Sequence, residues 1–139
     1  MKIHLATFYS SDLKRSAKRF KHQAEEMGIY DYVHLFSQKD LNSDFKNYVA
    51  ELLKKGKKRG FGHWVWQTHI HQVVLSKMNN GDIYHWCDVG CHFNKDGINR
   101  LKEYIKIVAN NINGCLFFSY KKPKLEEKFN EYSFPKNLE

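Results

Sequence analysis

The chain has 139 residues, which is enough for one domain with a sizeable buried core. Its composition, 42% apolar and 15% aromatic, is that of a globular protein, and no apolar run approaches the roughly 20 residues that span a bilayer. The net charge of +8 indicates an anionic partner, and nucleic acid, an anionic membrane face and a phosphorylated small molecule all fit it.

The first 36 residues predict one β-α-β unit. Residues 3–8 have strand composition and run into a polar loop at residues 7–11. Asp12 is expected to cap a helix whose apolar residues recur every three or four positions and which ends at Gly28. Residues 30–36 are rich in aromatic and β-branched side chains, which is typical of a strand. Two strands joined through a helix run parallel to each other.

The rest of the chain predicts further helices and strands in alternation. Apolar spacing predicts helices over residues 41–53 and 63–78, then a strand over residues 83–87, a helix over 98–108 and a fourth strand over 114–119. The order is β-α-β-α-α-β-α-β. It predicts an α/β fold with a mostly parallel, Rossmann-like sheet of about four strands flanked by helices. We expect one domain over residues 1–120 and a charged C-terminal tail over residues 121–139.

Asp88 stands where the predicted third strand ends, in the stretch Gly81–Asn94, which reads GDIYHWCDVGCHFN. In a doubly wound sheet, the loop after the first strand would lie at the same edge. Ligands of open α/β sheets bind beyond the carboxyl ends of the strands, so Asp88 is a candidate for holding a ligand or a metal. The other interpretation is that Asp88 caps a turn, a position that aspartate favours in any case.

The segment Lys54–Gly62, KKGKKRGFG, is basic and rich in glycine. Its lysines are expected to form a solvated linker. Arg59 with Gly60 and Gly62 suits a phosphate group, because glycine permits close approach of the backbone and arginine pairs with phosphate. The spacing is neither that of a Walker loop nor that of a Rossmann fingerprint.

A zinc site has candidate ligands among the histidines and cysteines. On a helix, His69 and His71 would point about 200° apart and could not share a metal. His85 and Cys87 lie on one face of a predicted strand and could do so. Single histidines and cysteines on apolar elements more often belong to the core, so we favour a structural role for them.

Catalysis by a thiol has weaker support. Cys91 and His92 are neighbours in sequence, and such neighbours rarely form a working nucleophilic pair. The three cysteines form no Cys-x-x-Cys pair, and the first residues lack the apolar core of a signal peptide. Reduced thiols in a cytoplasmic protein are therefore the expectation.

Binding of nucleic acid is a further alternative. Basic and aromatic residues interleave in residues 14–21, 54–66 and 120–124, and such a mixture lines grooves for single strands. Most of these aromatic residues fall at core spacing, and no nucleic-acid-binding motif is present.

The stretch Arg59–Asn94, RGFGHWVWQTHIHQVVLSKMNNGDIYHWCDVGCHFN, resembles a family of bacterial glycosyltransferase-like proteins. The matching family segment has a glycine-rich turn, a Trp-x-Trp-Lys-Pro helix start, a Gly-Asp-Ile strand and an Asp-Ala-Gly-Cys loop that ends in Asn. Residues 5–37 resemble the opening β-α-β unit of the same family. The likeness covers nearly the whole chain up to about Tyr120.

The resemblance implies a GT-A-like fold, the architecture of nucleotide-diphosphosugar transferases. In that fold an Asp-x-Asp-like motif ends a central strand and binds a divalent cation and the nucleotide. Asp88-Val89-Gly90 stands at this place, so the resemblance implies Asp88 as the ligand of Mn or Mg. The residues that it implies for nucleotide-sugar binding are Thr7, Tyr9, Arg59, Gly60, Gly62, Trp66, Asp88, Gly90 and Asn94.

The chain departs from the family pattern at three points. Gly90 stands where a full Asp-x-Asp motif has its second carboxylate. Gln67-Thr68 replaces the Lys-Pro pair, which removes a cation that could face phosphate. The chain also ends soon after the predicted fourth strand, whereas family members run on into a part that carries acceptor contacts and, in inverting enzymes, the catalytic base.

The expected activity is transfer of a sugar from a nucleotide diphosphosugar to a surface glycan of lipooligosaccharide or capsule type. The basic faces are expected to touch the anionic inner face of the membrane peripherally. No catalytic residue is assigned, since His63 and Asp96 are near the motif in sequence only. The alternative is a shortened, catalytically inactive module that binds a nucleotide or a partner protein, or, less expectedly, nucleic acid.

Overall fold

A parallel three-stranded sheet forms the centre of the protein in the computed structural model, which describes residues 1–116. The strands are β1 (Ile3–Tyr9), β2 (Tyr32–Ser37) and β3 (Ile83–Trp86), in the order β2-β1-β3. β1 pairs with β2 from His4 opposite Tyr32, and with β3 from Ile3 opposite Ile83. A strand with a parallel partner on each edge is covered on both faces, and residues 4–8 of β1 are all buried.

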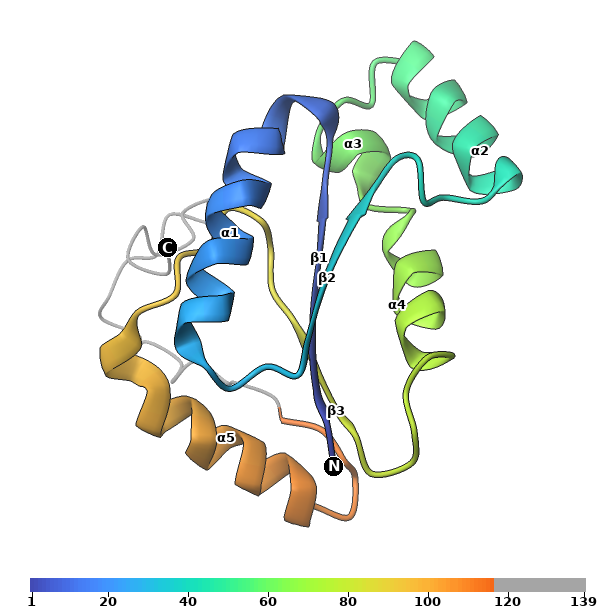
Figure 1. The fold of residues 1–139 in the computed structure, drawn as a ribbon. Helices are drawn as coiled ribbons and strands as arrows, with labels where there is room; N and C mark the ends of the chain where they lie inside the picture. The colour runs from blue at the N-terminus through green and yellow to red at the C-terminus, as the bar shows by residue number, and fades with distance from the viewer. Residues whose placement is uncertain (117–139) are drawn as a thin grey trace, which may run out of the picture.

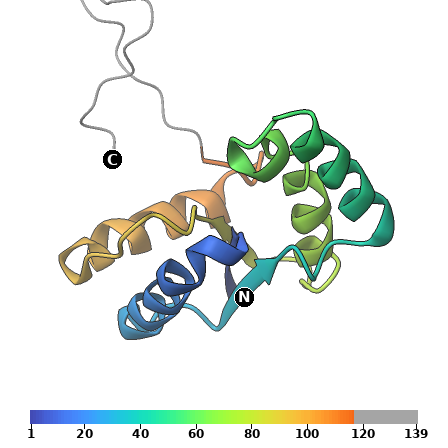
Figure 2. The same ribbon diagram turned by 90° about the horizontal axis from the view of Figure 1, so that it is seen from above.

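Helices cover both faces of the sheet (Figures 1 and 2). On one face lie α1 (Lys14–Met27) and α5 (Ile98–Asn110). On the other lies α4 (Gln67–Leu75), with α2 (Ser43–Lys54) and the single turn α3 (Gly60–His63) beyond it. The crossover from β1 leads to β2 on one side, and the next crossover returns past β1 to β3 on its other side. Because such crossovers are right-handed, their helices fall on opposite faces.

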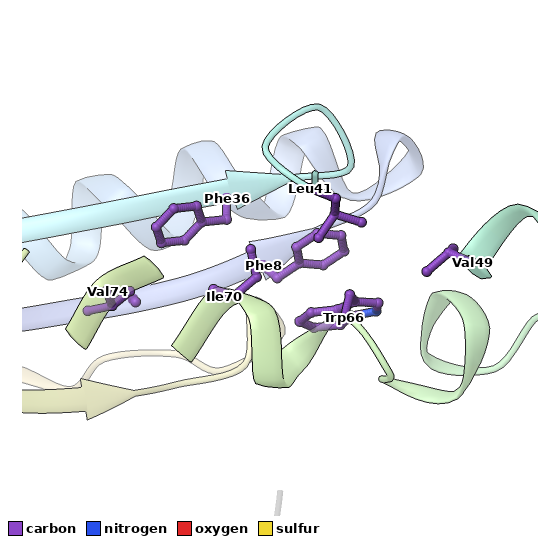
Figure 3. Close-up of a cluster of buried hydrophobic side chains, with 8 residues drawn as sticks. Phe8, Phe36, Leu41, Val49, Trp66, Ile70 and Val74 are labelled. Atoms are coloured by element: carbon purple, nitrogen blue, oxygen red, sulfur yellow. The ribbon is translucent and has the colours of Figure 1, made fainter. Parts of the chain in front are cut away.

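The hydrophobic core consists of two parts, one on each face of the sheet. Against α1, a part containing Leu5, Ala17, Phe20, Ala24 and Val89 is buried. Against α4, Phe8 stacks on Trp66 with ring centroids 3.8 Å apart, and further apolar side chains continue this part along the helix (Figure 3). Alternate residues of β1 supply the two parts, as the period of two of a strand requires.

The structure confirms an α/β fold with a small parallel sheet and flanking helices. The described residues hold three strands, and residues 114–116, where the fourth strand was expected to begin, form none. The remainder of the expected fourth strand and the expected tail at 121–139 lie outside the described residues. β1 extends to Tyr9, so the polar loop expected from residue 7 begins only at Ser10.

Two helix starts also differ from the prediction. Asp12 does not cap α1: it lies inside a 3-10 turn, η1 (Ser11–Leu13), and α1 begins after Leu13 without a side-chain cap. The helix expected from His63 begins only at Gln67, because residues 60–64 have positive φ angles that a right-handed helix cannot contain. Gly28 ends α1 in the left-handed conformation, as predicted.

A polar cluster joins the three strands at their amino ends. His4, which is 3% exposed, places its Nδ1 3.0 Å from Nε2 of His34 on β2. Its Nε2 lies 3.7 Å from Asp82, the residue before β3. Backbone N–H groups of Asn79 and Lys2 donate to the Asp82 carboxylate and hold its pKa below the usual value. The pairing of β1 with β3 thus has a carboxylate anchor at this end.

Burial lowers the pKa of three histidines, His34, His71 and His85, below the ordinary value of about 6.5. Near pH 6.5 these three histidines therefore begin to bind protons in the unfolded chain, whereas in the folded chain they bind them only at lower pH. Stability must fall as the pH drops from 6.5 toward the lowered pKa values, and the depressed pKa of Asp82 extends the loss to lower pH.

We expect the melting temperature to be highest above pH 7 and to decline steadily between pH 6.5 and pH 5. His71→Gln should reduce the decline, since His71 contacts Tyr84 through one bond of 2.6 Å that an amide can replace. Exchange of Gln72, an exposed residue beside His71 on α4, for Asn is the matched control: it changes no titratable group and should leave the pH profile unchanged. A melting temperature that stays constant from pH 7.5 to pH 5 would contradict this account.

Candidate functional site

A cleft of about 660 Å³ opens at the carboxyl ends of β1 and β3. Four segments line it: the end of β1 with the η1 turn (Phe8, Ser10 and Asp12), Leu53 of α2, the loop after β3 (Asp88, Val89 and Gly90), and part of residues 58–66. The crossover from β1 leads to β2 on one side, and the crossover from β2 leads past β1 to β3 on the other, so the strand order reverses here. Open α/β sheets bind their ligands at such a switch point.

Asp88 is the second residue after β3, and its exposed side chain lines the cleft. Trp86 Nε1 donates to Asp88 Oδ1 at 3.3 Å, and the backbone carbonyl of Asp88 accepts from the N–H of Cys91 at 2.9 Å. The turn is thus closed by the main chain, which leaves the carboxylate beside the cleft. Asp88 thus begins a turn, as the second interpretation expects, while its side chain also lines the cleft.

Arg19 of α1 holds the loop that carries Asp88. Its guanidinium donates to the carbonyl oxygens of Cys91 at 2.7 Å, Val89 at 2.9 Å and Gly90 at 3.5 Å. Gln23, one turn further along α1, accepts from the same guanidinium at 2.9 Å. The planar fork of arginine suits several acceptors at once, which the point charge of lysine does not. The loop is therefore fixed to α1 from behind.

The opposite wall of the cleft is a single left-handed turn. Five consecutive residues, from Gly60 to Trp64, have φ angles between 51° and 89°. The N–H groups of His63 and Trp64 donate to the carbonyls four residues earlier, at 2.8 and 3.1 Å. Three of the five residues are not glycine, and each costs roughly 1–2 kcal/mol in this conformation. Strain of this kind persists where surrounding contacts impose it, and it clusters at functional sites.

Specific contacts impose this turn. Trp66 Nε1 donates to the Gly60 carbonyl at 2.9 Å, and Trp66 itself is stacked on Phe8 in the core. A Cβ atom on Gly60 would come within 2.2 Å of the Trp64 indole, so only glycine fits there. Gly62 packs against Val49 of α2, where an added Cβ would meet that side chain at 3.3 Å. The turn is thus attached to both the sheet and α2.

Four of the nine residues expected to bind the nucleotide sugar line this cleft: Gly60, Trp66, Asp88 and Gly90. Gly90 is exposed, and an added Cβ would have no neighbour within 4 Å, so its backbone is open to a ligand. Trp66 is 4% exposed and supports the wall from behind more than it faces the cleft. The switch point brings these residues together from segments far apart in the sequence.

The other five are not among the lining residues, for identifiable reasons. Thr7 is fully buried within β1, because the strand extends past it, and Tyr9 packs against the core on the α1 face. Arg59 is exposed, and its guanidinium lies 5.4 Å from the centroid of the Trp64 ring. Gly62 is buried behind the wall. Asn94 caps the 3-10 turn η2 (Lys95–Gly97) by accepting from the N–H of Asp96 at 3.0 Å.

The cleft also contains polar residues that the sequence did not single out as ligands. Asp12 lines it and accepts a hydrogen bond from the Ser10 hydroxyl. Lys58, expected to be part of a solvated linker, lines it as well, as does the exposed Trp64. The signal for Asp12 was its position shortly after the first strand, at the same sheet edge as Asp88. No comparable signal marked Lys58 or Trp64.

Each histidine considered as a zinc ligand contacts a different aromatic residue. His69 stacks on Phe45, His71 bonds Tyr84, and His85 Nδ1 lies 2.9 Å from the Tyr30 hydroxyl. Burial raises the pKa of the Cys87 thiol to about 12, which keeps it neutral near pH 7. Within residues 1–116, no group of three or more histidine, cysteine or carboxylate side chains is placed to hold a metal ion.

Comparisons with known proteins do not identify the class of this protein, so only its fold and its site describe it. No family model, curated protein sequence or solved structure matches the chain. Across residues 1–116, none of the helices combines the length and the hydropathy that crossing a bilayer requires. What the fold and the site define is a small parallel α/β protein with a cleft at the switch point of its sheet.

Removal of the Arg19 side chain should destabilise the protein. Arg19→Ala leaves three carbonyls of the Asp88 loop without their donor, and we expect the free energy of unfolding to fall by about 1.5–3 kcal/mol. Chemical denaturation followed by circular dichroism measures this loss. Arg19→Lys should recover only part of it, because an ammonium group cannot reproduce the fork.

Arg100→Ala is the matched control for Arg19→Ala. Arg100 pairs with Glu103 on the exposed surface of α5, and surface pairs of this kind contribute about 0–1 kcal/mol. Equal losses for the two alanine variants would mean that the contacts of Arg19 add nothing to stability.

Proposed function

We propose that the cleft binds a nucleotide diphosphosugar and that the protein is a glycosyltransferase-like member of the GT-A group. The acceptor would be a surface glycan of lipooligosaccharide or capsule type. The observation that carries the proposal is the placement of Asp88, which stands in the loop just after β3 and lines a cleft of about 660 Å³. A volume of this size suits a ligand larger than a single phosphate. The likeness of residues 59–94 to the family segment supports the same ligand.

The chemistry of the walls suits the parts of such a ligand. A diphosphate needs positive charge and backbone groups that it can approach, and Lys58 and the exposed Gly90 supply these. The aromatic wall, with Phe61 and Trp64, suits the flat or apolar faces of a base or a sugar. Ser10 and Asp12 add hydrogen-bonding groups for hydroxyls.

A divalent cation, Mn or Mg, fits this donor set. Mg ions in nucleotide sites use one or two protein carboxylates and complete their coordination with phosphate oxygens and waters. Asp88 and Asp12 line the same cleft and could supply these carboxylates, which would compensate for the glycine at position 90. When bound, the ion would neutralise the charge that develops on the leaving diphosphate. The protein itself would orient the donor and hold it against the loop after β3.

Thermal unfolding with nucleotides tests the proposal. UDP, GDP, CMP and UDP-sugars are each added with and without Mn, and a ligand of the folded state must raise the melting temperature by mass action. We expect one nucleotide to raise it by several degrees at about 100 times its dissociation constant, and Mn to be required. Asp88→Asn should abolish the Mn-dependent part of the increase.

Asp44→Asn is the matched control, because Asp44 is exposed in the first turn of α2, outside the cleft. It should respond to nucleotides like the wild-type protein. Assays of sugar transfer then separate an active enzyme from a module that only binds nucleotide. Failure of every nucleotide to change the melting temperature of a folded protein would reject the proposal.

A basic segment beside the cleft supports the membrane as a further partner. Lys54, Lys55, Lys57, Lys58 and Arg59 follow one another at the end of α2, and all are exposed. The exposed side chains of Tyr48 and Trp64 come from the flanking elements. Clusters of four or more basic residues bind anionic lipid surfaces at about 1 kcal/mol per residue.

Sedimentation with vesicles tests this contact. We expect the protein to bind vesicles containing phosphatidylglycerol at low salt, and the triple change Lys54, Lys55 and Lys57 to Glu to lower the partition coefficient by at least about tenfold. Neutral phosphatidylcholine vesicles are the control. Binding of a single-stranded oligonucleotide without binding to either vesicle would instead favour the nucleic-acid module.

A further inference from the structure

Trp64 stands out among the aromatic residues that line the cleft. It is 41% exposed, whereas Trp66 and Phe8, which line the same cleft, are 4% and 6% exposed. Exposure of a large apolar ring disfavours folding, and packing on Gly60 leaves much of the Trp64 indole unburied beside the cleft. Its neighbour Trp66 already supplies the stacking contact that anchors the wall to Phe8.

The position of this ring is set by the left-handed turn. Trp64 is the last of the five residues with positive φ, and its indole lies directly over Gly60, where no Cβ would fit. The N–H of Trp64 is bonded to the Gly60 carbonyl at 3.1 Å, and Trp66 donates to the same carbonyl. The backbone therefore adopts a costly conformation whose effect is to present one indole beside the cleft.

The surroundings of the ring favour a flat, hydrogen-bonding group. The guanidinium of Arg59 lies 5.4 Å from the centroid of the Trp64 ring and brings donors to that side. The carbonyl oxygens and ring nitrogens at the edges of a nucleobase accept such donors, while its face stacks on an aromatic ring. A sugar offers hydroxyls at this place, which need no cation beside them.

We propose that Trp64 is the stacking wall of a nucleobase subsite, with Arg59 at the edge of the base. The diphosphate of the same ligand extends toward Lys58 and Asp88. This inference rests on the proposed function, because it requires the ligand to be a nucleotide. It assigns the base to the turn at residues 60–64 rather than to Tyr9, which packs against the core on the α1 face.

Calorimetric titration with three probes separates the base from the diphosphate. UDP, GDP and inorganic pyrophosphate are each titrated in the presence of Mn into the wild-type protein and into Trp64→Ala, Trp64→Phe and Asp88→Asn. Base stacking on an aromatic side chain corresponds to roughly a 5- to 100-fold change in affinity on substitution by alanine. We expect Trp64→Ala to lose this factor for the nucleotide that binds and to keep its affinity for pyrophosphate.

Trp64→Phe keeps a ring and should recover most of the affinity, which a merely structural role of the indole would not explain. Asp88→Asn should weaken the nucleotide and pyrophosphate alike. Tyr48→Ala is the matched control, since Tyr48 is 51% exposed on α2 and does not line the cleft. Circular dichroism and thermal unfolding show that each variant is folded before its affinity is compared.

The outcomes distinguish this inference from the proposed function. Wild-type protein that binds neither nucleotides nor pyrophosphate would overturn both. Equal affinity of the wild-type protein and Trp64→Ala for UDP or GDP would overturn the base subsite and leave the proposed function standing. A loss confined to UDP-sugars, with UDP unaffected, would place the sugar on Trp64 and likewise overturn the base subsite.

Discussion

The central position of β1 is the constraint on which the rest of the structure depends. β1 has a parallel partner on each edge, and residues 4–8 are buried between helices on both faces. The chain must therefore leave β1 toward one side and return on the other, which separates the connections above the carboxyl ends of β1 and β3. The cleft follows from this geometry and needs no special residue to open it. The cleft is then lined by the ends of β1 and α2 together with the loops that follow the elements.

The two walls of the cleft are held by different means. The loop of Asp88 is bonded through its carbonyl groups to Arg19, a favourable contact that costs the backbone nothing. The turn of Trp64 is held against its own preference by the indole of Trp66 and by the packing of Gly62 on α2. One wall therefore rests on polar contacts at the surface, and the other rests on the apolar core.

Sequence patterns predicted most of the elements because those elements follow simple periodic rules. The apolar stripe of α1 and its end at Gly28 are examples, since both depend on residues close in sequence. Two features could not be predicted. The left-handed turn contains three residues that disfavour it, and it exists only through contacts with Trp66 and α2. The role of Arg19 depends on a loop 70 residues away, which no local pattern reveals.

For the site, the sequence predicted the sheet edge at which the cleft lies better than it predicted which residues line the cleft. Asp88 and Gly90 were placed at the correct edge, because the end of a predicted strand identifies that edge. Thr7 was expected in a loop, but it pairs with Leu35 of β2 and therefore belongs to β1. Lys58 and Arg59 are adjacent, and only the conformation of the chain decides which of the two lines the cleft.

The bonds from Arg19 have a consequence for local motion. A loop that follows an edge strand would ordinarily open without disturbing the helices. Here, opening of residues 89–91 would deprive the half-buried guanidinium of Arg19 of three of its four acceptors, so the loop and the helix are expected to open together as one cooperative unit. Anything that orders the loop after β3 therefore also slows amide hydrogen exchange in the first turns of α1.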